Sequence, residues 1–267
     1  MTFRKLALSL VFGLFAAPLG ADETALATEE RADLEDIFET AGVAGAFALL
    51  DVAARRVFLV APDRARQRMI PASTFKIVNS LIALELGVVA DEEEIIPFGG
   101  AAQPIKAWEA DMSLRDAMRV SNAPVFQEVA RRVGVERYTE FLARINFGDG
   151  EVGEDVETFW LRGPLAISAV EQAAFLARLA LGDLPVSARS QAIVRDIVRM
   201  EERGGAMLFG KTGWTTAPSP DLGWFVGWVE RDDRVYAFAL NMDIASPADA
   251  GARIPLARVF LERLGVY

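Results

Sequence analysis

Ser73 and Lys76 are the residues of this chain whose types and spacing most directly suggest covalent chemistry. From Thr74 to Leu86, apolar residues recur every three to four positions, which predicts a helix. Pro71 precedes it, where a fixed φ and a missing N–H are tolerated. Ser73 is therefore expected at the helix start, with Lys76 one turn later on the same face. A hydroxyl at the positive end of a helix, with an amine within reach, has the parts of an activated nucleophile.

The composition limits which groups could serve as the base. The chain has no histidine and no cysteine, which excludes Ser-His-Asp triads, Cys-His pairs and zinc sites built from imidazole or thiolate. Of its 28 basic residues, only Lys5, Lys76, Lys106 and Lys211 are lysines. Burial can deprotonate a lysine, whereas an arginine stays charged, so these few lysines are the candidates for acid–base chemistry. A capping serine followed by a surface lysine has the same spacing, so the rest of the chain must distinguish the two interpretations.

Length, charge and the amino-terminal segment indicate the class of the protein and its location in the cell. The 267 residues, 52% of them hydrophobic, suffice for one large domain with a substantial core. The net charge of −10 argues against nucleic acid or an anionic membrane as a partner. Arg4 and Lys5 precede an apolar run that ends in small residues up to Ala21, which is typical of a secretory signal peptide. We expect residues 1–21 to be removed and residues 22–267 to form a single domain in the periplasm, with no membrane segment in the mature form.

Hydrophobic patterning predicts an α+β fold. Strands with hairpin-like spacing are expected at 45–51, 56–60, 207–213, 223–229 and 235–241. Further helices are expected at 22–40, 113–132 (interrupted near Pro124), 170–181, 186–203 and 253–264. One antiparallel sheet would then be built from both chain ends and flanked by helices, with an inserted helical subdomain at roughly 73–203.

Two further motifs follow the Ser73 helix. Ser121 and Asn122 fall where Pro124 interrupts a helix, and Lys211 with Gly213 ends a predicted strand. The glycine leaves room for a substrate backbone to lie alongside that strand. In chain order the three motifs supply a nucleophile, a hydroxyl relay and a cationic strand end.

With these motifs, the chain resembles the class D, oxacillinase-type serine β-lactamases, within the larger group of penicillin-recognising serine enzymes. The similarity covers nearly all of the mature chain: PASTFK (71–76), NSLIALE (79–85), SNAPVFQE (121–128), FWL (159–161), LAISA (165–169), KTGW (211–214), GWFVGW (223–228) and NMD (241–243). It implies a serine β-lactamase/penicillin-binding transpeptidase-like fold. It also implies hydrolysis of penicillins and oxacillin-type β-lactam antibiotics, and hence antibiotic resistance.

The resemblance assigns the central catalytic roles. Ser73 would attack the lactam carbonyl, with the N–H groups of Ser73 and Trp214 as the oxyanion hole. Lys76 would be carboxylated by CO2 to N6-carboxylysine and act as general base, with the Trp160 N–H as hydrogen-bond partner. Carboxylation requires a neutral amine, hence an apolar pocket that lowers its pKa.

The remaining roles concern proton relay and substrate binding. Ser121 would pass a proton to the leaving nitrogen, and Lys211, Thr212 and Arg253 would hold the substrate carboxylate. Gly213 and Trp214 would complete the substrate-binding strand. The resemblance implies no metal and no dissociable cofactor beyond CO2 or bicarbonate. The expected partner is a β-lactam, and the protein could be a monomer or a homodimer.

The chain departs from the family pattern at two places. Ala123 stands where valine is usual, which predicts a roomier pocket beside Lys76 and favours incomplete carboxylation. Phe147, Gly148 and Asp149 stand where Tyr-Gly-Asn is usual, and no catalytic role is carried onto them.

Three other functions compete with this interpretation. A β-lactam sensor or a penicillin-binding peptidase would be acylated without turnover. Sensors are usually fused to several membrane helices, and the tryptophan loop around Trp160 favours the lactamase over the peptidase. A non-enzymatic periplasmic binding protein would leave Lys76 and Lys211 inside motifs by accident. Among other aromatic residues, Trp224 and Trp228 are expected in the core or cleft wall, and Trp108 either lines the cleft or packs.

Overall fold

The structure, a computed structural model, describes residues 26–267, so the predicted signal peptide at 1–21 lies outside the described residues. The described chain contains one seven-stranded sheet of order β1-β3-β2-β7-β6-β5-β4. Its strands are β1 (Ala27–Glu30), β2 (Gly45–Asp51), β3 (Arg56–Val60), β4 (Arg199–Arg203), β5 (Ala206–Thr215), β6 (Asp221–Arg231) and β7 (Arg234–Ile244). All neighbouring strands are antiparallel except β1 and β3. The pairing of β2 with β7 joins the two ends of the chain, as the sequence predicts.

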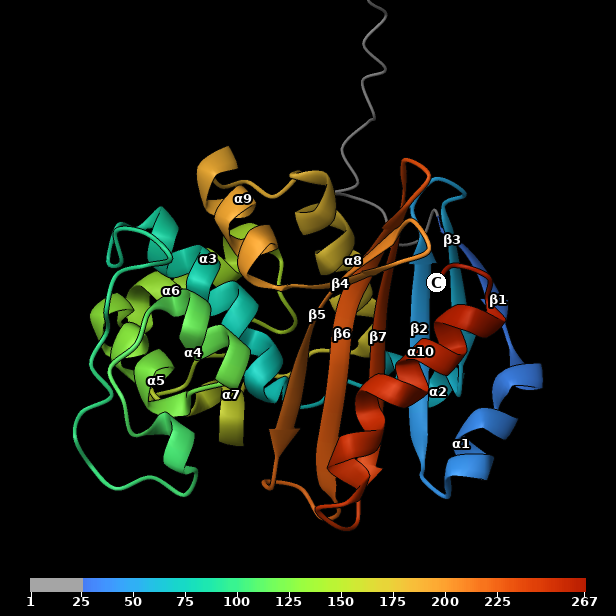
Figure 1. The fold of residues 1–267 in the computed structure, drawn as a ribbon, viewed down its shortest axis with the longest axis horizontal. Coiled ribbons are helices and arrows are strands. Elements are labelled where there is room, and N and C mark those ends of the chain that lie inside the picture. The colour runs from blue at the N-terminus through green and yellow to red at the C-terminus, as the bar shows by residue number, and fades with distance from the viewer. Residues whose placement is uncertain (1–25) are drawn as a thin grey trace, which may run out of the picture.

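Helices lie on both faces of this sheet and beside its β5 end (Figure 1). The helices are α1 (Asp36–Ala41), α2 (Pro62–Arg66), α3 (Lys76–Glu85), α4 (Leu114–Val120), α5 (Ala123–Val133), α6 (Val135–Ile145), α7 (Phe159–Arg162), α8 (Ala169–Leu181), α9 (Ala188–Ile197) and α10 (Arg253–Arg263). Helix α10 covers one face and α8 the other, and α3 to α7 gather beside β5. No helix in residues 26–267 is long and apolar enough to cross a membrane.

Alternating side chains of the central strands feed two separate cores. In β2, Phe47 and Leu49 pack with α10, including a stack of Phe47 on Phe260 at 4.6 Å. Ala46 and Ala48 point to the opposite face, where they belong to the core that contains α8. Side chains this small let α8 lie close to the sheet, since successive residues of a strand face opposite sides. The sheet is thereby fixed between two layers and provides a rigid support for β5.

The structure corrects two of the predicted helices. The segment 22–40 contains strand β1 before α1, and the segment 186–203 ends its helix at Ile197 and continues as β4. Both missed strands are edge strands whose side chains are largely exposed. These strands are stabilised by backbone pairing, β1 with β3 and β4 with β5. Because backbone pairing does not require buried side chains, their sequences lack the alternation of apolar residues that would have predicted a strand.

The interrupted helix at 113–132 is confirmed, although the break has a different cause. Helix α4 ends at Val120, and Ser121 adopts a left-handed conformation with φ 56° and ψ 39°. Asn122 then caps α5, its Oδ1 accepting from Val125 N at 3.1 Å. Pro124 occupies the first turn of α5, where proline is tolerated. The turn places Ser121 between two helices, facing the end of the sheet.

Candidate active site

Ser73 lies in a short 3-10 turn, Ala72–Phe75, that runs directly into α3. Ala72 has φ +52°, a left-handed conformation that is strained for a residue with a Cβ. The turn is held by the Thr74 hydroxyl, which donates to the Pro71 carbonyl at 2.7 Å. The Lys76 Nζ donates to Ser73 Oγ at 2.7 Å. The predicted nucleophile and amine therefore meet, and local strain immediately precedes the serine.

Lys76 is completely buried, with 0% of its surface exposed. Burial lowers the pKa of the Lys76 amine well below its usual value of 10.5, and the positive charge of Lys211 lowers this pKa further. The ring of Phe126 lies with its centroid 5.5 Å from Nζ. Lys76 stays fully buried although Ala123, at the start of α5, is the small residue expected to make this pocket roomier.

Trp160 is buried in the same region, on α7. Its ring stacks on Phe75 with centroids 5.5 Å apart and meets Phe159 edge-on at 5.0 Å. Its Nε1 is buried without a hydrogen-bond partner among the described residues. A buried N–H left unpaired costs about 1–3 kcal/mol, so the placement of this indole is unfavourable for folding alone.

Lys211 connects the sheet to the turn between α4 and α5. Its Nζ donates to Ser121 Oγ at 2.9 Å and to the Thr212 carbonyl at 2.9 Å. Burial, together with the nearby charge of Arg253, lowers the pKa of the Lys211 amine from 10.5 to about 7. The Lys211 amine, in contact with the Ser121 hydroxyl, can therefore gain or lose a proton near neutral pH.

Strand β5 presents a free edge to this region. Its pairing with β4 ends at Phe209, and Gly210 N donates outward to the Val198 carbonyl at 2.9 Å. Because backbone groups alternate in direction along a strand, the N–H groups of Thr212 and Trp214 face the same outward side as that of Gly210. Trp214 N–H is thus available as a donor to a group bound beside Ser73.

Gly213 and Arg253 hold β5 against its neighbours. A Cβ on Gly213 would lie 3.0 Å from the Pro71 carbonyl oxygen and 3.1 Å from Thr74 Cγ2, so a side chain here would crowd the strand against the Ser73 turn. On the other side of the strand, the Arg253 guanidinium donates to the Gly213 carbonyl and, through Nε, to the Ala250 carbonyl at 2.6 Å. Burial lowers the pKa of Arg253 from its usual value, although arginine stays protonated in practice.

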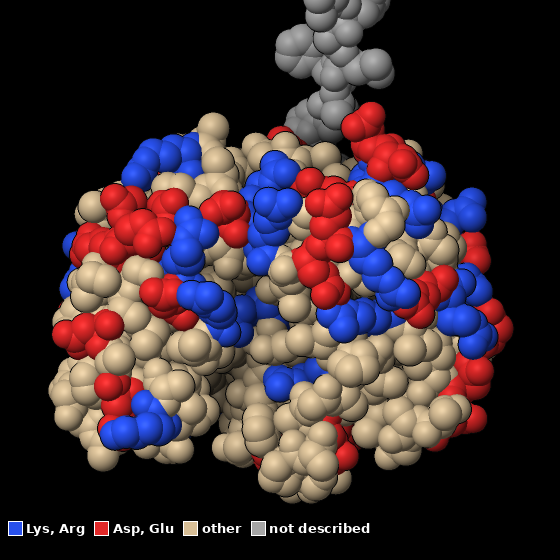
Figure 2. All heavy atoms as spheres, viewed as in Figure 1, with Lys and Arg blue, Asp and Glu red and all other residues tan. Residues whose placement is uncertain are grey.

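A cavity of about 740 Å³ brings most of the predicted residues together. Its lining includes Ser73, Ser121, Thr212, Gly213, Trp214 and Arg253. The predicted Lys76, Lys211 and Trp160 are not part of the lining but are buried behind it. Figure 2 shows the surface hollowed between the helical half and the sheet, with basic side chains inside the hollow.

Several lining residues were missed by the sequence analysis. These are Ile105, Val120, Leu161, Arg162, Thr215, Thr216 and Ala217. Trp108 also lines the cavity, and its indole N–H donates to the Val120 carbonyl at 3.1 Å. Trp224 and Trp228 are fully buried. Most of the missed residues lie in loops or at element ends. Val120 directly precedes Ser121, Leu161 ends the FWL motif and Thr215 follows the KTGW motif, but none of the three is a residue type that signals chemistry.

Phe147, Gly148 and Asp149, which depart from the family pattern, support the site from outside the lining. The Phe147 ring packs on Phe75 with centroids 5.9 Å apart. Asp149 Oδ1 accepts from Ala166 N at 3.1 Å. Gly148 has φ +57°, and a Cβ there would lie 2.3 Å from the Ala166 carbonyl oxygen. These residues therefore fix the loop behind the Ser73 turn.

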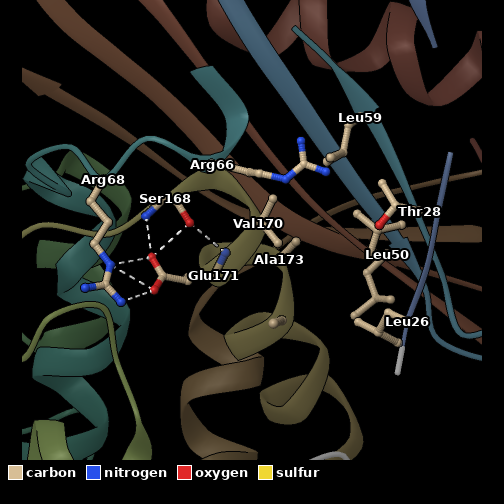
Figure 3. A pocket seen from close by; sticks show the side chains of 12 residues that line it. Leu26, Thr28, Leu50, Leu59, Arg66, Arg68, Ser168, Val170, Glu171 and Ala173 are labelled. Carbon is tan, nitrogen blue, oxygen red and sulfur yellow. Dashed lines mark hydrogen bonds and ion pairs between the residues drawn. The ribbon is translucent and has the colours of Figure 1, made fainter. Parts of the chain in front are cut away.

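A second cavity, of about 360 Å³, lies between α8 and the β1–β3–β2 edge of the sheet (Figure 3). Its polar contacts serve the start of α8. Ser168 and Glu171 form a capping box, and Arg68 Nε donates to Glu171 at 2.9 Å. Leucines from the strands make up much of the remaining wall. The hydrogen bonds among Arg68, Ser168 and Glu171 stabilise the start of α8. We therefore assign the candidate active site to the cavity at Ser73.

Comparisons with known proteins agree with this geometry. The family model described as penicillin binding protein transpeptidase domain matches residues 46–262. The chain is 39% identical over 260 residues to beta-lactamase OXA-48 of Klebsiella pneumoniae, which covers 97% of this chain and 98% of that protein. It is 36% identical over 232 residues to beta-lactamase OXA-10 of Pseudomonas aeruginosa, covering 86% and 87%. The solved structure of FUS-1 (OXA-85), a class D beta-lactamase from Fusobacterium nucleatum subsp. polymorphum, superposes with a TM-score of 0.86 at 38% identity over 89% of this chain and 99% of that one.

Proposed function

Because the chain belongs to the class D β-lactamases, we propose that it hydrolyses β-lactam antibiotics, penicillins and oxacillin-type compounds included, through an acyl-enzyme on Ser73. Antibiotic resistance is the expected biological outcome. The observation that carries the proposal is the buried Lys76 amine, which contacts Ser73 Oγ at 2.7 Å. A buried amine whose pKa is lowered by burial, beside a hydroxyl at a strained turn, is an arrangement for activating a nucleophile.

Acylation would use groups from both halves of the fold. Ser73 Oγ would give its proton to the base on Lys76 and attack the lactam carbonyl, and the N–H groups of Ser73 and Trp214 would stabilise the negative charge that develops on the carbonyl oxygen. As the lactam C–N bond breaks, Ser121 would give its proton to the leaving nitrogen. Lys211, which donates to Ser121 Oγ and has a pKa of about 7, would replace that proton.

The free edge of β5 would orient the substrate. Lys211 lies on β5 itself, and Arg253 is bound to the Gly213 carbonyl of the same strand. Together with the Thr212 hydroxyl they would hold the substrate carboxylate. A carboxylate fixed there places the lactam carbonyl farther along the strand, beside Ser73 and Trp214.

The residues around Lys76 also fit carboxylation of its amine by CO2. Burial favours the uncharged amine that the addition requires, and the unpaired Nε1 of Trp160 is a donor suited to a buried anion. When present, the carbamate supplies an anionic general base next to Ser73. Lys76 would then hold that base in place for both acylation and hydrolysis of the Ser73 ester, with Trp160 as its hydrogen-bond partner.

We further propose that the mature protein acts in the periplasm after removal of residues 1–21. The charged and apolar pattern of that segment supports this, as does the absence of a membrane-spanning helix in residues 26–267. The proposal leaves both a monomer and a homodimer possible, because the Ser73 cavity is formed within one chain.

Intact-mass measurement after mixing the protein with a penicillin tests the proposal. We expect turnover by the native protein, no covalent adduct on Ser73→Ala, and on Lys76→Ala at most a slowly formed adduct that then persists. Ser80→Ala is the matched control, since Ser80 lies on the same helix outside the cavity lining and should leave turnover intact. An adduct of native stoichiometry on Ser73→Ala would contradict the assignment, and a single acylation without turnover in the native protein would favour a sensor or penicillin-binding protein.

A further inference from the structure

The lining of the Ser73 cavity contains two charged side chains, Arg253 and Arg162, and no carboxylate. Arg253 is half-buried and engaged with two backbone carbonyls. Arg162 is exposed, and its guanidinium forms no hydrogen bond or ion pair with any other residue in 26–267, whereas its backbone N–H donates to the Thr158 carbonyl at 2.9 Å. The pKa of Asp155 is lowered mainly by a hydrogen bond from Thr158, with the charge of Arg162 as a minor, through-space cause. Arg162 is therefore a cation at the cavity whose guanidinium N–H donors have no partner among the described residues.

The fold fixes where along the cavity Arg162 lies. It is the last residue of α7, two residues after the fully buried Trp160. The Leu161 carbonyl accepts a hydrogen bond from Thr215 Oγ1 at 2.5 Å, which ties the end of α7 to the end of β5. Arg162 thus belongs to the end of the cavity formed by Thr215 and the residues that follow it.

The order of groups along β5 tells which part of a substrate reaches that end. The proposed carboxylate contact is at Thr212 and the proposed oxyanion donor is at Trp214. Continuing in the same direction leads to Thr215, a span from Thr212 of about 10 Å at the usual rise of a strand. The acylamino side chain of a penicillin leaves the lactam ring on the side opposite the carboxylate. Its first carbons would accordingly lie near Thr215 and Arg162.

We propose that Arg162 forms a second anion subsite that favours β-lactams with an additional carboxylate on the α-carbon of the acylamino side chain. This inference rests on the proposed function and specifies its substrate class. A free guanidinium presents several N–H donors in a geometry suited to a carboxylate. No acidic side chain in the cavity lining competes for it.

Because Arg162 is exposed, its effect is moderate and sensitive to salt. Ion pairs of exposed groups change an equilibrium by about two- to five-fold, and screening weakens them as ionic strength rises. The effect should appear in KM rather than kcat, since the subsite touches the side chain and not the reacting bond.

The test compares carbenicillin with benzylpenicillin, which differ by one carboxylate on that α-carbon. For Arg162→Gln we expect the ratio of kcat/KM values, carbenicillin over benzylpenicillin, to fall about three-fold at low salt. Arg162→Lys should restore part of the ratio. Arg137→Gln, which removes an exposed arginine of α6 outside the cavity lining, should leave the ratio unchanged.

A ratio that stays the same in Arg162→Gln while both penicillins are hydrolysed would overturn the inference and leave the proposed function intact. An equal fall in Arg137→Gln would overturn it as well, because the effect would then come from net charge alone. A native protein that hydrolyses neither penicillin would refute the proposed function, and the inference with it.

Discussion

Replacing Lys211 by methionine is expected to stabilise the protein at mildly acidic pH while abolishing most of its activity. Lys211 is 5% exposed, and its amine faces the positive charge of Arg253. Its two hydrogen bonds, to Ser121 and to the Thr212 carbonyl, only partly offset the loss of hydration. Methionine has a similar length without the charge, so the variant removes the electrostatic penalty and keeps most of the packing.

The size of the effect follows from the pKa of Lys211. A tenfold change in proton affinity corresponds to about 1.4 kcal/mol, so a fall in pKa from 10.5 in the unfolded chain to about 7 in the folded one corresponds to about 5 kcal/mol. Below the folded pKa, the amine is protonated in both states and the full penalty applies. As pH rises from 7 toward 10.5, the folded protein releases the proton first and the penalty declines. Native stability should therefore increase over that window.

Urea unfolding of the native and variant proteins measures this difference. The free energy of unfolding of Lys211→Met, relative to the native protein, should fall by about 3 kcal/mol between pH 6 and pH 9. Lys106→Met is the control, because the side chain of Lys106 is 89% exposed and its removal should have little effect at either pH. A difference between Lys211→Met and the native protein that does not vary with pH would refute the argument.

Three further changes probe single contacts. Trp160→Phe removes the unpaired buried N–H together with part of the buried ring, so turnover should need about ten-fold more added bicarbonate. An unchanged bicarbonate titration would exclude Trp160 as the partner of modified Lys76. Tyr138→Phe removes the hydroxyl that donates to the buried Asn79 Oδ1 at 2.6 Å. The free energy of unfolding should fall by about 1–3 kcal/mol, because Oδ1 is left without that donor, and an unchanged value in urea would contradict this. Arg253→Gln should raise KM for penicillins more than it lowers kcat, and steady-state kinetics with the opposite split would argue against a role in carboxylate binding.

The parts of the fold that the sequence predicted are those with strong local patterns. The central strands β2, β5, β6 and β7 are apolar runs because both of their faces are buried between helices. The edge strands β1 and β4 were assigned to helices because their pairing partners, rather than their own side chains, determine their conformation. A pattern read along the chain does not record such long-range pairing.

The same distinction holds within the site. Ser73, Lys76 and Lys211 stand in short motifs and could be named from the sequence, and the structure adds the distances that join them. Arg162 carries no motif, and its importance depends on the hydrogen bond between Thr215 and the Leu161 carbonyl. The left-handed conformation of Ala72 also gives no signal, because alanine does not favour it.

In the proposed mechanism, Ser73 is acylated and a base on Lys76 then promotes hydrolysis of the acyl-enzyme. A chromogenic cephalosporin tests both steps directly. Turnover is followed in solutions depleted of CO2 and after addition of bicarbonate, for the native protein and for Lys76→Ala. We predict sustained turnover by the native protein that rises with bicarbonate, and at most a slow, stoichiometric acylation without turnover from Lys76→Ala. Sustained rapid turnover by Lys76→Ala would contradict the role of Lys76, and a single burst from the native protein would contradict β-lactam hydrolysis itself.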